Sequence, residues 1–264
     1  MQAVAITGIG VINPLGIGRE AFWQGCLQAR SGLRAIETFD TRGMQSNIAG
    51  LVVGFDAGDC MPSRLYRRMS RISKMTVAAS IEAVADSGLD LDGLDRERVA
   101  VVVGTAYGAS SHVEAFFVSL LQDGPRGAQP FLFPETVPNA PASHVAMYYS
   151  ITGPNSTFCQ NAISGETAIQ YACNLLNQKI VDVALVAGAE ELSAILYQCY
   201  HAVGTLNPVI AATDAQAIPH AGGGLVLGEG AGMLVMERAD FASERGARPY
   251  GFVRAVTVTG GAAS

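Results

Sequence analysis

Two short runs of small and β-branched apolar residues constrain the fold of this chain more than any other feature. Arg98–Val103 ends at Gly104, and Asp182–Ala187 ends at Gly188. Solid apolar runs of this length are typical of strands that are buried on both faces of a parallel sheet. Segments with helical periodicity lie between the strand-like runs along the chain. The sequence therefore predicts an α/β fold, with helices layered on a mostly parallel core sheet.

The remaining elements follow from the same two periodicities. Further strands are expected at Val4–Thr7, Ser156–Gln160, Gly230–Met236 and Tyr250–Thr257. Helices are expected at Arg19–Arg30, Met69–Ser87, Ser110–Leu121, Pro138–Tyr149, Ser164–Asn177 and Asp240–Arg245. Gly8–Gly10 predicts a tight turn that ends the first strand. A dinucleotide fingerprint is not expected there, because no third glycine opens a helix and no acidic residue follows at the required distance.

Composition narrows the functional classes. Hydrophobic residues make up 49% of the 264 residues and charged residues 15%, which indicates a packed globular chain. The net charge of −6 argues against nucleic-acid binding, and the densest basic stretch, from Arg64 to Lys74, is interpreted as a solvated helix face. The N-terminus has no signal-peptide pattern, and no apolar stretch reaches the roughly 18 residues of a membrane span. We expect a soluble, cytoplasmic protein.

Cysteine and histidine spacing predicts no metal site. The five cysteines form no CxxC pair and are expected to be reduced and buried, and the four histidines are scattered. Two glycine-rich tracts, Ala221–Gly224 and Gly228–Gly232, predict close strand pairing. A P-loop is excluded because no Lys-Ser/Thr pair follows either tract. No metal and no organic cofactor are predicted.

The segment Gly153–Ile169 is the one with a clear chemical pattern. It is typical of a strand, a sharp turn and a helix. A side chain at such an elbow faces the N-terminus of the helix, where partial positive charge favours an anion. A cysteine at that point would have a lowered pKa and would act as a thiolate nucleophile. In this chain the residue at the elbow is Ala162.

This segment resembles the nucleophile elbow of β-ketoacyl-ACP synthases, in which Gly-Pro is followed by seven residues, Cys, one residue and Ser-Gly. Gly153-Pro154 and Ser164-Gly165 match, and Ala162 stands where the family has cysteine. Other segments that resemble the family, in the same order, are Val4–Pro14, Gly104–Gly108, Gly124–Arg126, Phe133-Pro134, Asn139, Gly188–Glu190 and Gly228–Gly232. The resemblance implies a thiolase-like, layered α/β/α fold.

Three departures from the family pattern limit the activity that is expected. The methyl group of Ala162 cannot be acylated, and Cys159 is interpreted as a buried structural thiol that points away from the turn. The charged loop before the late glycine motif is reduced to Pro219–Gly224, and its His220 matches no catalytic histidine of the family. The family's second half, with both catalytic histidines and a lysine, is missing. Residues 1–250 are therefore expected to form the N-terminal thiolase-fold domain, and residues 251–264 the start of a C-terminal half that is absent or truncated.

What the resemblance implies is a non-catalytic ketosynthase-like subunit of the chain-length-factor type. Such a subunit pairs with an active ketosynthase and shapes the tunnel for the acyl chain, which arrives on the phosphopantetheine of an acyl carrier protein. The residues that match the tunnel wall or the subunit interface are Tyr107, His112, Phe116 and Phe117.

Two other interpretations remain open at this point. The chain could be a truncated or Cys→Ala-inactivated β-ketoacyl-ACP synthase, or a scaffold protein without a tunnel. The helix expected at Ser164–Asn177 is apolar almost all round, which is typical of a buried helix. We therefore expect that the chain is not a stable monomer and needs a partner or a further segment to cover this helix.

Overall fold

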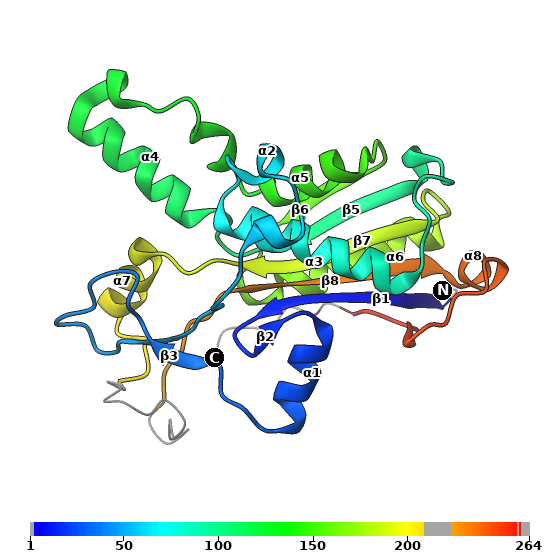
Figure 1. Ribbon diagram of the computed structural model, residues 1–264, viewed down its shortest axis with the longest axis horizontal. Helices are drawn as coiled ribbons and strands as arrows, with labels where there is room; N and C mark the ends of the chain where they lie inside the picture. Colours follow the sequence, from blue (N-terminus) through cyan, green and yellow to red (C-terminus); the bar gives the residue numbers. More distant parts are fainter. Residues whose placement is uncertain (1–2, 209–222, 258, 260–264) are drawn as a thin grey trace.

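The computed structural model describes residues 3–208, 223–257 and 259, and its core is a seven-stranded sheet (Figure 1). The strand order is β2-β1-β8-β7-β5-β6, with β9 beside β1. The bounds are β1 Val4–Asn13, β2 Gly16–Ile17, β5 Val99–Gly104, β6 Asn155–Phe158, β7 Val183–Glu190, β8 Gly230–Arg238 and β9 Gly251–Val253. Strand β9, which begins at the expected domain boundary, thus belongs to the same sheet.

Most long strands of this sheet run in one direction. Strand β5 is parallel to both β6 and β7. Strand β8 is antiparallel to β7 and to β1, so that β1 points the same way as the parallel trio. The sheet is therefore mixed, with a mostly parallel core, and the carboxyl ends of β5, β6 and β7 meet at one edge.

Helices cover both faces of the sheet, which gives three layers (Figure 1). Helices α3 (Arg71–Ser87) and α5 (Ala140–Tyr149) lie on one face, and α6 (Ser164–Asn177) lies on the other. Side chains of β5 alternate between them: Val101 and Val103 pack in the α3/α5 layer, whereas Ala100 and Val102 pack against α6. Successive side chains of β5 point to opposite faces, and helices cover both faces. Every residue of the strand is therefore apolar.

Two helices extend beyond the edge at which the parallel strands end. Helix α4 (Ser110–Asp123) projects away from the sheet, and α7 (Ala194–Val203) lies beside its base (Figure 1). Helix α7 was not predicted from the sequence. The other elements are α1 (Arg19–Leu27), α2 (Ser63–Tyr66), α8 (Ala239–Glu244) and a small sheet of β3 (Leu33–Ala35) and β4 (Ile48–Gly50).

The predicted turn at Gly8–Gly10 was wrong, because both glycines lie inside β1. A Cβ atom at Gly8 would lie 2.2 Å from the carbonyl oxygen of Ala83, and one at Gly10 would lie 1.9 Å from that of Ala79. The glycines therefore allow the backbone of α3 to pack directly on β1.

On α1, Trp23 and Leu27 are 56% and 62% accessible to solvent. The expected burial of the cysteines was wrong. Among the cysteines, Cys26, Cys159 and Cys199 are exposed, and only Cys173 is fully buried. The basic stretch from Arg64 to Lys74 is not one helix face either, since it holds α2, a connection and the start of α3.

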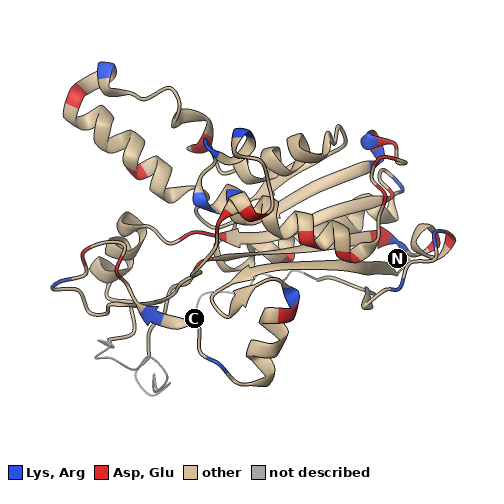
Figure 2. Ribbon diagram, in the orientation of Figure 1, with Lys and Arg blue, Asp and Glu red and all other residues tan. Residues whose placement is uncertain are grey.

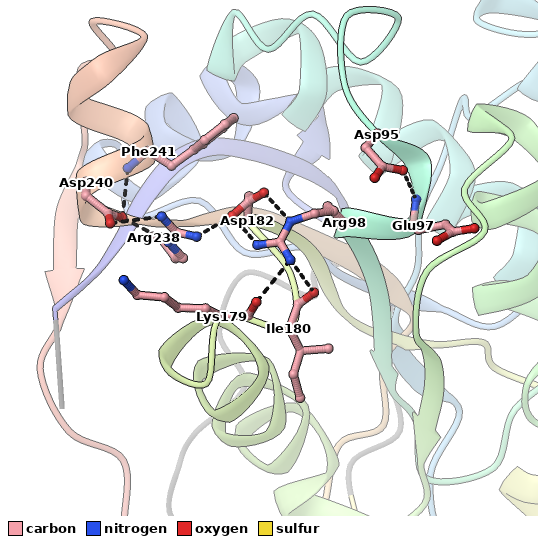
Figure 3. A network of polar contacts seen from close by, with 9 residues as sticks. All are labelled: Asp95, Glu97, Arg98, Lys179, Ile180, Asp182, Arg238, Asp240 and Phe241. Carbon is pink, nitrogen blue, oxygen red and sulfur yellow. Dashed lines mark hydrogen bonds and ion pairs between the residues drawn. The ribbon is translucent and has the colours of Figure 1, made fainter.

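Charged residues lie mostly on helices, loops and the ends of strands rather than in the middle of the sheet (Figure 2). At the start of β5 and β7, Asp182 accepts hydrogen bonds from Arg98 at 2.6 and 2.7 Å and from Arg238 at 2.5 Å (Figure 3). The Arg98 guanidinium lowers the pKa of the Asp182 carboxyl. This network ties together three strands at the end of the sheet opposite the elbow. No helix among the described residues is long and apolar enough to cross a membrane.

Candidate active-site elbow and adjoining cavities

The elbow is a hydrogen-bonded turn between β6 and α6. Strand β6 ends at Phe158, and a short 3₁₀ turn, η5 (Asn161–Ile163), leads directly into α6. Asn161 has a φ of 50°, in the left-handed region. The hydroxyl of Ser164 accepts a hydrogen bond from the Gln160 N–H at 2.8 Å and donates one to the Asn161 carbonyl at 2.7 Å. Ser164 therefore closes the turn that presents residue 162.

A glycine on the neighbouring strand allows α6 to start so close to the sheet. Gly104 ends β5, and a Cβ atom there would lie 2.3 Å from the carbonyl oxygen of Ser164. Its parallel partner on β7 is Gly188, where a Cβ atom would meet no atom within 4 Å. The first turn of α6 thus rests on the end of β5 and not on that of β7.

Ala162 is exposed and lines a cavity of about 490 Å³ at the ends of the parallel strands, which we call the elbow cavity. The described lining residues come from β5, β7, the elbow, α7 and the segment before β8. They are Gly104, Thr105, Ala106, Tyr107, Asn161, Ala162, Ser164, Gly165, Glu166, Gly188, Ala189, Glu190, Glu191, Leu192, Leu196, Tyr200, Leu225, Leu227 and Gly228. This set contains no cysteine, histidine or lysine.

None of the described histidines lines the elbow cavity, and two of them bond to other residues. His144 pairs with Glu135, and the Nδ1 atom of His201 accepts a hydrogen bond from the Gln45 N–H at 3.1 Å. His112 does not line the elbow cavity. His220 and most of the Pro219–Gly224 loop lie outside the described residues. The described part of the elbow cavity therefore offers no imidazole to support an oxyanion or a decarboxylation.

Glu190, at the end of β7, is one of the ionisable residues that line the elbow cavity. Burial raises the pKa of its carboxyl, although hydrogen bonds from Ala106 and Thr105 oppose that effect. The Thr105 hydroxyl donates to Oε1 at 2.9 Å, whereas Oε2 is buried without a partner among the described residues. An acidic group of this kind does not favour a thiolate nearby.

Cys159 does not replace the missing nucleophile. It is exposed rather than buried, so the interpretation as a buried structural thiol was wrong. Partial burial raises the pKa of the Cys159 thiol, and the charge of Glu190 raises it further. Cys159 is not among the residues that line the elbow cavity. Its thiol is therefore neither activated nor placed for acyl transfer.

A second cavity, of about 520 Å³, is lined by residues of α4 and α7, and we call it the apolar cavity. It shares Tyr107, Leu196 and Tyr200 with the elbow cavity. The hydroxyl groups of Tyr107 and Tyr200 lie 2.7 Å apart, and their rings meet edge to face. The hydrogen bond with Tyr200 raises the pKa of Tyr107 to about 12. The two tyrosines form a neutral, hydrogen-bonded wall between the cavities.

Of the four residues predicted to form the tunnel wall or interface, only Tyr107 lines either cavity. Phe116 packs against Phe133 and Phe117, with ring centroids 5.8 and 5.9 Å apart, and Phe117 is 52% exposed. His112 is half-buried on α4. Val113 and Ser110 are the α4 residues that line the apolar cavity. Sequence reasoning missed them, because the helical phase of α4 relative to the unpredicted α7 was unknown.

One buried carboxylate, that of Glu191, accepts hydrogen bonds from the first turns of α3 and α4. Glu191 is 1% exposed and accepts hydrogen bonds from the Ile72 N–H at 2.9 Å and the Ser111 N–H at 2.7 Å. These donors belong to the first turns of α3 and α4, which have unpaired N–H groups and partial positive charge. No cluster of metal ligands is present among the described residues.

The family model described as "Beta-ketoacyl synthase, N-terminal domain" matches residues 1–242. The chain belongs to the β-ketoacyl synthase family. The sheet with helices on both faces is accordingly the thiolase-like fold of ketosynthases.

Curated relatives include ketosynthases of fatty-acid and polyketide synthesis. The chain is 31% identical to the 3-oxoacyl-[acyl-carrier-protein] synthase 2 of Vibrio cholerae, over 99% of this chain and 64% of that protein. It is 33% identical to a putative polyketide beta-ketoacyl synthase 1 of Streptomyces cyaneus, over 94% of this chain and 61% of that protein. The chain therefore spans less than two thirds of the length of these relatives.

Solved structures show the same fold. The ishigamide ketosynthase/chain length factor is 29% identical, with a TM-score of 0.81 over 96% of this chain and 62% of that one. A β-ketoacyl synthase from Burkholderia phymatum is 26% identical, with a TM-score of 0.83 over 96% of this chain and 63% of that one.

Proposed function

We propose that this chain is a non-catalytic ketosynthase-like subunit of the chain-length-factor type. It pairs with an active β-ketoacyl synthase and shapes that enzyme's acyl or polyketide tunnel during decarboxylative Claisen condensation on carrier-protein-bound chains. The observation that carries the proposal is Ala162. Ala162 stands at an elbow whose flanking residues match the family's sequence pattern, and it presents a methyl group to the elbow cavity.

The chemistry of condensation explains why this observation supports the proposal. A ketosynthase transfers the acyl group from a carrier thioester to its own thiolate, and the carbanion formed by loss of CO₂ then attacks that new thioester. Ala162 cannot form the thioester, and the Cys159 thiol has a raised pKa. The roles left to the chain are binding, packing against a partner and limiting the space for the acyl chain.

Similar proteins support the choice of partner. The ishigamide structure is that of a ketosynthase/chain length factor. A second structure, 25% identical with a TM-score of 0.75, holds a type II polyketide acyl carrier protein in complex with its ketosynthase bound to the hexaketide. We extend both features to this chain: an active ketosynthase as its partner and an acyl carrier protein as the donor of the chain.

Intact mass spectrometry of a reconstituted system tests the proposal. The tagged chain is used to retain proteins from its source, and the retained ketosynthase is incubated with acyl carrier protein and an acyl donor. The expected result is an acylated cysteine on the retained ketosynthase and an unmodified chain. Acylation of the chain itself, lost in Cys159→Ser, would overturn the proposal. Condensation by Ala162→Cys without a partner would instead identify the chain as an inactivated synthase.

A further inference from the structure

A third cavity, at the C-terminal end of α1, is lined by hydrogen-bond donors and by no carboxylate of the described residues. Its volume is about 420 Å³, and its described lining residues are Pro14, Leu15, Gln28, Ala29, Arg30, Ser31 and Arg34. We call it the arginine cavity. The chain as a whole is acidic, with 23 acidic and 17 basic residues, so a cavity with two guanidinium groups and no acid in its described lining reverses the charge locally.

Neither guanidinium group is neutralised within the described chain. Arg30 and Arg34 form no ion pair among the described residues. Arg34 also borders a neighbouring cavity, which Glu37 and Glu229 line. Glu229 is already bound by Arg71, whose N–H groups donate to its two carboxylate oxygens at 2.6 and 2.8 Å, and Glu37 forms no ion pair with Arg34. Both Arg30 and Arg34 are exposed, so a ligand can reach them from solvent.

The fold holds the guanidinium group of Arg30 against α1. Ala29 has a φ of 50°, in the left-handed region, and the Arg30 backbone N–H donates to the Gly25 carbonyl at 2.9 Å, so the chain turns back at the end of the helix. One N–H of the guanidinium group donates to the Ala21 carbonyl at 3.2 Å. A Cβ atom at Gly25 would lie 3.2 Å from the same nitrogen, so the glycine leaves room for this contact. The remaining guanidinium N–H groups have no acceptor among the described residues.

The rest of the lining comes from the connection between α1 and β3 (Figure 1). Gly32 packs on Pro14, which directly follows β1, since a Cβ atom at Gly32 would lie 2.5 Å from the Cβ atom of Pro14. The Ser31 hydroxyl accepts a hydrogen bond from the Leu33 N–H at 3.2 Å, which leaves its own proton available to a ligand. Arg34 lies in β3, and the pairing of β3 with β4 fixes its backbone. The donors of the arginine cavity are therefore carried by a packed backbone.

We propose that the arginine cavity binds a small organic phosphate monoester, with Arg30 and Arg34 as the partners of its phosphate group. Guanidinium groups donate pairs of N–H groups to the oxygens of phosphate and carboxylate groups. A phosphate monoester carries about two negative charges near neutral pH and several acceptor oxygens on one group, whereas a carboxylate carries a single charge. The monoester is thus the group that matches two guanidinium groups and the Ser31 hydroxyl.

The size of the cavity indicates that the ligand extends beyond its phosphate group. The volume of about 420 Å³ lies within the range of small-molecule sites, which is roughly 300–1,000 Å³. Pro14, Leu15 and Ala29 supply apolar surface for an organic group. Binding at this site does not depend on the proposed function, because the arginine cavity shares no described lining residue with the elbow cavity or the apolar cavity.

Equilibrium dialysis of the purified chain tests the proposal. The probes are phenyl phosphate, inorganic phosphate, the diester methyl phenyl phosphate and benzoate, each at about pH 7.5, where the monoester is mostly a dianion. The variants are Arg30→Gln, Arg34→Gln and Ser31→Ala. Arg248→Gln is the matched control, because Arg248 is an exposed arginine outside the cavity that forms no ion pair among the described residues. The method measures bound probe per chain and therefore tolerates self-association.

We expect a single phenyl phosphate per chain, bound about tenfold more tightly than the diester or benzoate, because these two carry one charge. Inorganic phosphate is expected to bind about fivefold more weakly than phenyl phosphate, because it lacks the apolar contact. Arg30→Gln and Arg34→Gln are each expected to weaken binding about tenfold, and Arg248→Gln to leave it unchanged. Ser31→Ala removes a donor without changing the charge, and its expected loss of about threefold separates a defined site from general electrostatic attraction.

Several results would overturn the proposal. An equal loss of affinity in Arg248→Gln and Arg34→Gln, or several phenyl phosphate molecules per chain, would show attraction to arginines in general. Full affinity in both Arg30→Gln and Arg34→Gln would place the ligand elsewhere. Equal binding of benzoate would exclude phosphate as the recognised group, and equal or tighter binding of inorganic phosphate would exclude an ester as the ligand.

Discussion

The carboxylate of Glu191 accepts a hydrogen bond from the backbone N–H of Ser111 at 2.7 Å, and its second oxygen accepts one from Ile72. One buried carboxylate thus caps the N-termini of α3 and α4, two helices that are distant in sequence. Residue 109, at the start of α4, is an alanine and offers no side-chain cap. Glu191, which directly follows strand β7, caps the helix instead.

Glu191→Ala is expected to lower the free energy of unfolding by about 3 kcal/mol, because it leaves two helix N-terminal N–H groups buried without acceptors. Urea denaturation measures the change. Glu166→Ala is the matched control, because Glu166 is an exposed acid in the first turn of α6, and it should change stability by less than about 0.5 kcal/mol. Equal losses in the two variants would refute the double cap.

A pair of glycines in register provides a second test. Gly104→Ala should destabilise the protein by about 3 kcal/mol or displace the elbow, because its Cβ atom would lie 2.3 Å from the Ser164 carbonyl oxygen. Gly188→Ala, at the partner position on β7, should be tolerated, because no atom lies within 4 Å of that Cβ position. Thermal unfolding of both variants distinguishes them, and equal tolerance would contradict the close approach of α6 to β5.

Acid should weaken the structure through Glu135. Burial by itself raises the pKa of this carboxyl, but hydrogen bonds from His144 and Ser70 outweigh it and lower the pKa to about 2. A depressed carboxyl pKa stabilises the folded state above the unfolded value of about 4.3, and this contribution is lost as the pH falls from there towards about 2. Unfolding free energies between about pH 5 and pH 3 should therefore fall more steeply for the wild type than for Glu135→Gln. Parallel curves would argue against the prediction.

Cys159 should react slowly at neutral pH. Its pKa is raised by partial burial and by Glu190, so its thiolate fraction stays below that of an ordinary thiol, with a pKa of about 8.5, until the pH is alkaline. The alkylation rate of Cys159 relative to Cys26, followed from pH 7 to pH 10, should rise with pH. Glu190→Gln should bring the midpoint for Cys159 closer to the ordinary value. Faster alkylation of Cys159 than of Cys26 at pH 7 would contradict the prediction and support Cys159 as a nucleophile.

Self-association tests the expectation that the chain is not a stable monomer. Ala168, Ala172 and Leu176 of α6 are buried, but an apolar groove of about 360 Å³ remains between α6 and strands β1, β7 and β8. Light scattering of the purified chain should show oligomers or aggregates, and Ile169→Glu in this groove should reduce them. A monodisperse monomer with a cooperative thermal transition would disprove the expectation.

The sequence predicted those features that depend on local periodicity. Helix α6 has the predicted bounds, Ser164–Asn177. The elbow motif marks its start, and the helical spacing of its apolar residues marks its length. Gly8 and Gly10 were misread, because their role is to accommodate α3, which is more than 60 residues away in the chain. Ser110 and Tyr200 could not be found, because an unpaired hydroxyl and a tyrosine pair become visible only when α4 and α7 are placed side by side.

The exposure of Ala162 has a consequence for how this protein could have diverged from its relatives. The residue contacts the cavity rather than the core, and the turn around it is held by the Ser164 hydroxyl and by backbone groups. Replacing a reactive thiol by a methyl group at this position removes no packing and no hydrogen bond that the fold requires. Under the proposed function, a change of one codon therefore removes the reaction and leaves the fold and the surrounding cavity intact.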